Sequence, residues 1–387
     1  MLKVTTRYIC AQFIPSFLVA FVFFVAFLNT FYMFRMLSLI VDKGVEVTTV
    51  LNMLMNLSLY FFPLAAPISA FFATIFVLSK LSEDSEIIAM RSFGINKFQL
   101  YMPFLILSLS IGFALNSLSS ILIPRANADF KNTVVKLTSS GMLTSIKSGQ
   151  FFTDIPNATL FAQSVSEDGN GFKNVFLHVN EKKTSEQRII FAKSGTLIKI
   201  YADDWHAPSL RLHLKDGNII HVNKGMDRVE KVLFEEYDFP IFNTDFATQM
   251  LAKDSMKTNQ ELDELIAKKE REYQTAIQQK KSSDEILNLK KSLFKTQNEY
   301  YSRLILFWQI VLFVFVGFTL GIKKGRGKGK NNTATAALML IGYFVIYFLL
   351  LSISQKGSLS PILASNLPSL FLLFFGIKFF KDLDWAT

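Results

Sequence analysis

The 387-residue sequence contains a single cysteine, Cys10, so it cannot form an internal disulfide. Any domain that it exposes to an oxidising compartment must be stable without one. It lacks a nucleotide-binding phosphate loop, a His-Glu-x-x-His pair and a nucleophilic serine elbow. The histidines have separations that match no metal-ligand pattern. They are His178, His206, His213 and His221. These absences argue against a metal site, a hydrolase and a nucleotide-driven motor within the chain.

Apolar residues dominate instead: half of the chain is hydrophobic, 40 residues are Phe, and the mean hydropathy is +0.31. This composition is typical of integral membrane proteins. Six apolar runs are each long enough to cross about 30 Å of hydrocarbon. They cover roughly 12–34, 54–79, 98–123, 304–322, 334–353 and 361–380. The sequence therefore predicts six transmembrane helices, three on either side of a long polar block.

Lys and Arg are unevenly distributed around these runs. With the N-terminus inside, the outer short loops carry only Arg35, Lys43 and Lys356. The inner short segments carry Lys3, Arg7, Lys80, Arg91, Lys97, Lys323, Lys324, Arg326, Lys328, Lys330, Lys378 and Lys381. The positive-inside rule then predicts cytoplasmic termini, a cytoplasmic 80–97 loop and an external polar block. The first run is too long for a cleaved signal peptide and is expected to remain as a span.

The segment 80–97, KLSEDSEIIAMRSFGINK, is polar and lies between two spans. Ser82 as N-cap, acidic residues in the first turn and Gly94 as a stop predict a helix over about 83–93. At about 1.5 Å per residue it would be roughly 16 Å long, too short to cross a bilayer. Ile87 and Met90 share one face, and Ala89 and Phe93 an adjacent one. The segment is either a coupling element that binds a partner or an interfacial helix resting on lipid headgroups.

Arg35 and Lys43 lie near the outer end of the first span. Arg35 can extend its charged end to the membrane surface without any specific ligand. Alternatively, both residues contact the phosphates of an anionic amphiphile, because guanidinium groups offer paired donors to phosphate oxygens. The residues alone leave both readings open.

From about 146 to 239 the hydrophobic period changes to two, as in β-strands. The expected strands cover 149–154, 158–166, 172–180, 188–193, 195–201, 210–215, 218–223 and 229–239. Turns are expected at 167–171, Ser194-Gly195 and Asp216-Gly217. Eight short strands without helices between them predict a sandwich, a jelly roll or a partly open barrel. Its apolar interior is either a simple core or a path for acyl chains.

Residues 257–303 are charged and helical in pattern, and they continue directly into the fourth span. Ser282 and Glu285 stand three apart as a capping box, which predicts a helical hairpin or a bent long helix. A coiled coil with another copy is the further alternative. Gly317 and Gly321 in the fourth span permit a close helix contact. The cations after this span either anchor the topology or bind anionic lipid or a partner.

With these residues in view, the chain resembles the LptF/LptG permease family, the membrane subunits of an ATP-driven lipopolysaccharide exporter. The segment from Ser85-Glu86 to Gly94 matches the family's cytoplasmic coupling helix, S-E-x-x-x-[ML]-x-x-x-G. Further matches are GQFF from Gly149, FKNVFLHV at 172–179 and FAKSGTL at 191–197. These texts, and Arg35 seven residues before Asp42, look closer to LptF than to LptG.

The resemblance implies an external β jelly roll inserted between two sets of three spans, in the inner membrane. The expected domains are 1–123 with the coupling helix, a periplasmic β domain at 124–256, a helical connector at 257–303, and 304–387. The implied partners are a homologous permease, a dimer of the LptB ATPase, an LptC-like jelly roll and lipopolysaccharide, with no cofactor. Arg35 and Lys43 would contact lipid phosphates, and Glu86 would contact the ATPase. The coupling site as a whole would comprise Ser85, Glu86, Ile87, Met90, Arg91 and Gly94.

Other functions remain open on the sequence. One is a membrane-anchored scaffold whose β domain binds an envelope component without transport. Another is a permease of the same fold that exports a different lipid or a lipoprotein. An intramembrane enzyme is disfavoured, because the spans lack paired carboxylates, His clusters and a Ser/Lys pair.

Overall fold

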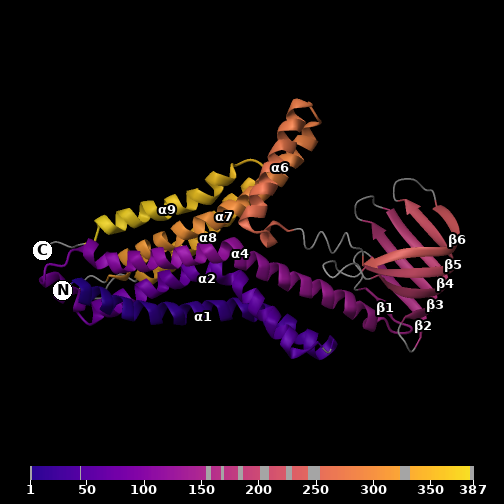
Figure 1. Ribbon diagram of the computed structural model, residues 1–387, viewed down its shortest axis with the longest axis horizontal. Helices are drawn as coiled ribbons and strands as arrows, with labels where there is room; N and C mark the ends of the chain where they lie inside the picture. The colour runs from indigo at the N-terminus through magenta and orange to yellow at the C-terminus, as the bar shows by residue number, and fades with distance from the viewer. Residues whose placement is uncertain are drawn as a thin grey trace. The chain divides into compact units, whose positions relative to one another are not determined.

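A computed structural model of the chain divides it into two compact units, Met1–Asn127 with Asp254–Thr387, and Ala128–Lys253. Figure 1 shows a helical unit and a β unit. The structure describes residues 2–43, 45–153, 158–166, 170–181, 186–200, 209–223, 229–242, 253–322 and 332–383.

The helical unit contains six helices that are long and apolar enough to cross a membrane, which confirms the predicted membrane fold. The helices are α1 (Leu2–Lys43), α2 (Val47–Glu83), α4 (Lys97–Ser145), α7 (Ser283–Gly321), α8 (Asn332–Gln355) and α9 (Pro361–Lys381). The α4 helix belongs to the helical unit up to Asn127, and its remaining residues belong to the β unit. The start of α1 and the end of α9 lie at the same end of this unit (Figure 1). The short helix α3 (Glu86–Ser92) follows α2.

The α2 and α7 helices form the centre of the helical unit and are the most buried of the six, whereas α1 and α8 are the least buried. The two glycines of α7 allow this contact. A Cβ atom on Gly317 would lie 3.0 Å from the Phe71 carbonyl oxygen, and one on Gly321 would lie 2.8 Å from the Leu78 Cβ. The predicted role of the glycine pair in close helix packing is therefore confirmed.

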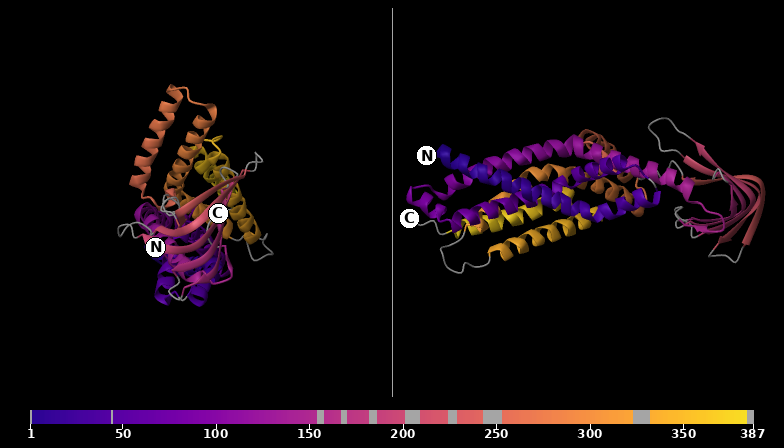
Figure 2. Two further views of the ribbon diagram at one scale, coloured as in Figure 1. Left: turned by 90° about the vertical axis from the view of Figure 1, so that its right-hand side faces the viewer. Right: turned by 90° about the horizontal axis from the view of Figure 1, so that it is seen from below.

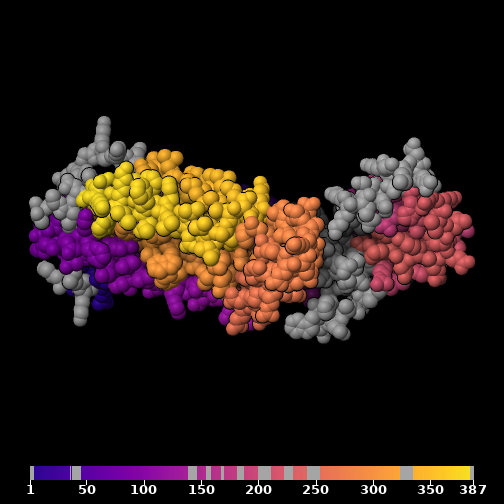
Figure 3. Space-filling model, turned by 90° about the horizontal axis from the view of Figure 1, so that it is seen from above, coloured from indigo at the N-terminus to yellow at the C-terminus, as the bar shows by residue number. Residues whose placement is uncertain are grey.

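The connector is a helical hairpin, one of the two predicted alternatives. It comprises a short 3-10 helix, η1 (Asp254–Met256), then α6 (Asn259–Gln278) and the first part of α7. Ser282 caps α7 as predicted, because its Oγ accepts a hydrogen bond from the Glu285 amide. Figure 3 shows one face of the helical unit, on which both α9 (yellow) and α6 (orange) lie at the surface.

The β unit is a single antiparallel sheet with the strand order β1-β2-β3-β4-β5-β6. Figure 2 shows that the sheet is strongly curved. The strands are β1 (Phe151–Phe152), β2 (Ala158–Val165), β3 (Gly171–Glu181), β4 (Glu186–Ile200), β5 (Ser209–Asn223) and β6 (Val229–Phe242). Its inner face is filled by buried side chains, including Leu160, Leu177, Leu212 and Leu214.

The prediction of eight strands is wrong, because β4 and β5 each continue through an expected turn. In β2 to β6, one residue of each strand has no backbone pairing partner, and these five residues lie side by side across the sheet. They are Gln163, Asn174, Lys193, Asp216 and Glu235. Asn174 and Asp216 have positive φ angles there, 49° and 51°. At this row, two residues instead of one separate successive inward-facing side chains in each of the five strands. The inward-facing positions are therefore three residues apart there instead of two. The bend across the sheet was therefore interpreted as a turn in β4 and in β5, where Ser194-Gly195 and Asp216-Gly217 have the composition of turns.

Two helices differ in extent from what the sequence suggested. The third apolar run ends at Ile123, but the helix that contains it, α4, continues through Pro124 to Ser145. A proline removes one backbone donor and does not by itself end a long helix. Ser82 is not an N-cap, because it lies within α2 and its Oγ donates to the Leu78 carbonyl oxygen at 2.7 Å. The helix after it therefore starts at Glu86 and not near Glu83.

Candidate functional site

The candidate coupling site is α3 with its two flanking turns. Ser85 joins α2 to α3 in the left-handed region, with φ 60° and ψ 12°. Gly94 ends the segment with φ 80°, and its amide donates to the Arg91 carbonyl oxygen at 2.8 Å. No described atom lies within 4 Å of a Cβ built on Gly94, so the backbone angle, and not crowding, favours glycine there. These two turns set α3 apart from the long helices on either side.

The two faces of α3 have different environments. Ile87 is only 4% exposed and belongs to the apolar cluster that includes Leu81 and Leu100, and Met90 packs against the same cluster. Ile88 and Phe93 point outward, with 52% and 71% of their surface exposed. A partner that docks on α3 would therefore touch Ile88 and Phe93 directly. The predicted site residues Ile87 and Met90 lie on the opposite face of α3 and hold it against the apolar cluster of the spans.

Glu86 begins α3 and forms a hydrogen bond to the first span. The Tyr8 hydroxyl of α1 donates to the Glu86 Oε1 at 2.8 Å. Nearby, the Lys97 Nζ at the start of α4 donates to the Phe380 carbonyl oxygen of α9 at 3.1 Å and lies 4.6 Å from the Phe380 ring centroid. Three segments are predicted to face the cytoplasm: the start of α1, α3 and the end of α9. These contacts place all three at one end of the helical unit. Their predicted common side of the membrane is consistent with this geometry.

The remaining predicted site residues differ in what the structure describes. Ser85 and Arg91 are half-buried, and Gly94 is exposed. Arg35 and Lys43 belong to α1, but their side chains lie outside the described residues, as do the cations at 323–330. Their proposed lipid contacts stay predictions.

A second polar cluster lies near the middle of α7, where its apolar part begins, and sequence reasoning missed it. Its centre is Arg303, which is 6% exposed and lies 18 residues from Gly321, roughly 27 Å along the helix at about 1.5 Å per residue. Its guanidinium donates to the Glu299 carboxylate from Nε at 3.1 Å and from Nη2 at 2.9 Å. It also donates to the Lys257 carbonyl at 2.7 Å, the Asn259 Oδ1 at 3.1 Å and the Asp254 carbonyl at 3.3 Å. All five N–H groups are therefore engaged.

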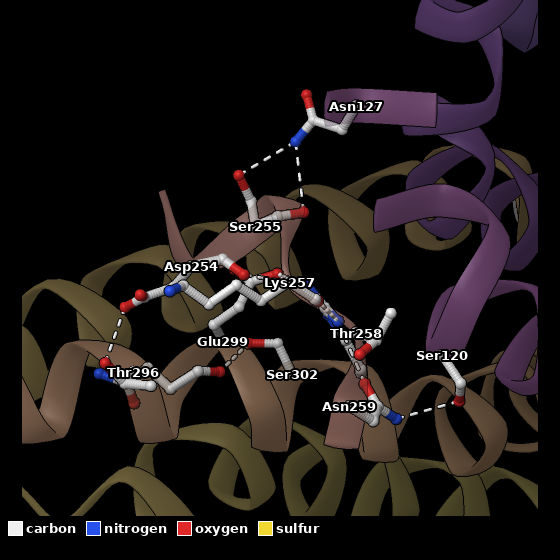
Figure 4. Close-up of polar contacts among 12 residues, drawn as sticks. Ser120, Asn127, Asp254, Ser255, Lys257, Thr258, Asn259, Thr296, Glu299 and Ser302 are labelled. Carbon is white, nitrogen blue, oxygen red and sulfur yellow. Dashed lines mark hydrogen bonds and ion pairs between the residues drawn. The ribbon is translucent and has the colours of Figure 1, made fainter. Parts of the chain in front are cut away.

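Further polar side chains in this cluster tie several helices together, and Figure 4 shows the contacts of Asn127, Asn259 and Thr296. The Asn127 amide of α4 donates to the Ser255 Oγ at 3.0 Å, and the Asn259 amide donates to the Ser120 Oγ at 3.0 Å. The Thr296 hydroxyl donates to Asp254 Oδ2 at 2.7 Å. We call this cluster the polar anchor, defined by Ser120, Asn127, Asp254, Ser255, Lys257, Asn259, Thr296, Glu299 and Arg303. Its sequence signal was a Glu four residues before an Arg at the edge of a span.

The described residues contain no group of three or more His, Cys, Asp or Glu side chains that could hold a metal ion. The functional interpretation therefore rests on α3, the polar anchor and the spans.

Comparison with known proteins identifies the family. The family described as "Lipopolysaccharide export system permease LptF/LptG" matches residues 7–382. The chain belongs to the LptF/LptG permease family. The match includes both sets of spans, α3 and the β unit, so the resemblance inferred from short motifs is confirmed over nearly the whole chain. The LptF/LptG architecture also accounts for a sheet inserted between groups of apolar helices.

A curated relative from Rickettsia prowazekii (strain Madrid E), the uncharacterized protein RP871, is 23% identical over 163 residues. The alignment covers 42% of this chain and 44% of the relative, so the chain matches less than half of that protein's length. This similarity adds no function beyond that of the LptF/LptG family.

Proposed function

We propose that this chain is the permease subunit of an ABC transporter that extracts lipopolysaccharide from the inner membrane and passes it to a periplasmic bridge. The observation that carries the proposal is the LptF/LptG family match over residues 7–382. The chain acts as a transport subunit and not as an enzyme, and a separate LptB-like ATPase dimer supplies the energy. Moving an acyl chain out of lipid costs about 0.8 kcal/mol per CH₂, so extraction of a multi-chain lipid requires such a source.

The α3 helix is the proposed contact for the ATPase. Its outward Ile88 and Phe93 offer an apolar surface, and Glu86 beside them offers a carboxylate to a basic side chain. The buried Ile87 couples this surface to the apolar cluster of the spans. A force on α3 would therefore reach the helical unit through side-chain packing.

The α1 and α8 helices, the least buried spans, are the proposed contacts for lipid and for a homologous LptG-like permease. On α1, Phe23, Phe27 and Phe31 are 62%, 53% and 71% exposed. Arg35 and Lys43 follow them in the sequence, where they would meet lipid phosphates. The β unit would hand the lipid to an LptC-like jelly roll in the periplasm, with both chain termini in the cytoplasm.

The packing of the inner face of the β unit bears on whether that face is a path for acyl chains or a simple core. Leu160, Leu177, Leu212 and Leu214 are each 0% exposed, so the interior is filled by its own side chains. Acyl chains that travel along this face would have to displace these residues. Passage of lipid therefore requires the sheet to open, and without opening the interior serves only as a core.

A charge reversal at Glu86 tests the proposed ATPase contact. Glu86→Arg should abolish copurification of the cytosolic ATPase with the permease, because it places a cation against a basic partner group. Glu264→Arg is the matched control, since Glu264 is an exposed carboxylate of α6, outside the candidate coupling site, and should retain the ATPase. Full ATPase binding by Glu86→Arg would contradict the proposed contact.

A photoreactive residue at Phe31 tests the cargo. Crosslinking in intact cells should capture lipopolysaccharide, and a photoreactive residue at the buried Phe71 of α2 should not. A scaffold protein would give at Phe31 only the adducts of the bulk membrane lipid, without enrichment of lipopolysaccharide, and a permease for other cargo would enrich a different lipid or a lipoprotein.

A further inference from the structure

The hydrogen bond between Tyr8 and Glu86 joins residues 78 positions apart and fixes the carboxylate at the start of α3. We propose that Tyr8 is a positioning residue that aims Glu86 at the ATPase, an inference that rests on the proposed function of α3. Tyr8 holds Oε1, and Oε2 stays available to a cationic side chain of the partner. The first span thereby becomes part of the coupling site.

Both members of this bond are held in place by buried neighbours. Ile9 follows Tyr8 in α1 and is 0% exposed, and Ile87 follows Glu86 in α3 and is 4% exposed. Ile9 and Ile87 belong to the same apolar cluster. One turn along α1, Phe13 is also fully buried and packs edge-on against Phe104 of α4 at a centroid distance of 5.8 Å. The phenol and the carboxylate are therefore brought together by packing on either side of them.

A carboxylate can accept hydrogen bonds at two oxygens, and a tyrosine occupies one of them without neutralising the charge. A hydrogen bond to a charged acceptor is stronger than one between neutral groups, so it limits the rotation of the Glu86 side chain. A side chain that is already oriented loses less conformational freedom when the partner binds. Removing the phenol oxygen should therefore weaken ATPase binding although Tyr8 itself need not touch the ATPase.

The experiment measures the affinity of the full permease complex for its ATPase in four variants: wild type, Tyr8→Phe, Glu86→Gln and the double variant. Tyr8→Phe removes one oxygen and keeps the ring, and we expect roughly two- to tenfold weaker binding, the range for loss of one hydrogen bond. In the Glu86→Gln background the same change should have a much smaller effect, since its partner has lost its charge. Tyr32→Phe, a half-exposed tyrosine further along α1, is the matched control and should bind as wild type.

The outcomes separate this inference from the proposed function. Wild-type affinity in Tyr8→Phe, together with weak binding by Glu86→Gln, overturns the positioning role and leaves the ATPase contact intact. An equal loss from Tyr8→Phe in both backgrounds also overturns it, because Tyr8 would then act without Glu86. Wild-type affinity in Glu86→Gln counts against the proposed contact itself. Unchanged thermal stability of Tyr8→Phe establishes that any loss of binding is not a loss of folding.

Discussion

The two ends of the helical unit are built from different interactions. At the α3 end, Ile87 is held in an apolar cluster, and the hydrogen bonds from Tyr8 and Lys97 join neighbouring helices at the margin. At the polar anchor, Arg303 is buried with five donors engaged. The first end depends mainly on apolar burial, and the second depends on directed polar contacts.

This difference bears on how the two ends respond to force. Packed apolar helices can slide by small shear movements, because their contacts have no strict direction. A buried guanidinium cannot shift without breaking charge-assisted hydrogen bonds. The anchor also holds both places where the chain passes between the two units, through Asn127 on one side and Asp254 with Ser255 on the other. We therefore expect the α3 end to adjust during coupling and the polar anchor to stay fixed.

The largest effect is expected from Arg303→Met, which breaks the polar anchor. It leaves the Glu299 carboxylate, the Asn259 side chain and two backbone carbonyls without their donor. Removal of one partner of a buried ion pair typically costs about 3–5 kcal/mol. The free energy of unfolding in detergent measures the loss. Arg271→Met on the exposed side of α6 is the control, and it should change stability by about 0.5 kcal/mol or less. Equal stability of the two variants would remove the distinction between the ends.

A pair of alanine variants tests whether the α3 end separates packing from binding. Ile87→Ala should destabilise the protein by about 2–4 kcal/mol, because it removes a buried side chain from the apolar cluster. Ile88→Ala should leave stability nearly unchanged and weaken ATPase binding, because Ile88 is 52% exposed. Thermal unfolding and ATPase affinity measured on both variants distinguish the two faces. A stability loss at Ile88 as large as that at Ile87 would contradict this assignment.

A smaller effect is expected at Gly321, the last residue of α7, where α7 packs against α2 close to the α3 end. Gly321→Ala places a Cβ 2.8 Å from the Leu78 Cβ and 3.1 Å from the Ile75 Cα, so the helices must move apart. Overpacking of this kind costs about 1–3 kcal/mol. Gly342→Ala in α8 is the matched control, since no described atom lies within 4 Å of its added Cβ. A loss for both variants alike would point to helix effects that do not involve the α2–α7 contact.

Hydropathy and charge were sufficient to predict the spans, because length and apolar composition are local properties of the sequence. The position of α3 was predicted for the same reason, since a polar segment between two spans is conspicuous. Its start was misplaced at Ser82, because a serine hydroxyl can equally donate to the carbonyl four residues earlier within a helix. The sequence also gave no sign that Ile88, and not Ile87, is the exposed isoleucine, since both lie in one short apolar run.

The contacts that were missed depend on residues far apart in the chain. Tyr8 reaches Glu86 across 78 positions, and Arg303 reaches Asp254 across 49. No local pattern identifies such pairs. The sheet bend was misread for a related reason: its unpaired row is visible only when all strands are aligned in register, and Ser194-Gly195 alone has the composition of a turn. Local signals predicted the elements, and the long-range pairs required the fold.

The smallest effect concerns the start of α6, where the polar anchor meets a capping box that the sequence reading overlooked. The Glu261 amide donates to the Thr258 Oγ1 at 3.4 Å, and the Thr258 amide donates to the Glu261 Oε2 at 2.7 Å. That backbone hydrogen bond is the main cause that lowers the pKa of Glu261 below its usual 4.5. Thr258→Ala removes the cap and should loosen α6 by about 1 kcal/mol.

The lowered pKa of Glu261 also gives this cap a pH dependence with a definite sign. A carboxyl group whose pKa is lower in the folded state stabilises the fold above its unfolded pKa, and it loses that contribution as the pH falls through the folded pKa. Amide hydrogen exchange in α6 should therefore become faster, relative to α7, as the pH falls below 4.5. Glu261→Gln should remove this acid-dependent difference, whereas Glu264→Gln, an exposed residue one turn on, should keep it. Asn259 is hydrogen-bonded to Arg303, so the faster exchange should stay within α6 and should not reach the turn of α7 that contains Arg303. Faster exchange in that turn would mean that the polar anchor is less rigid than its hydrogen bonds imply.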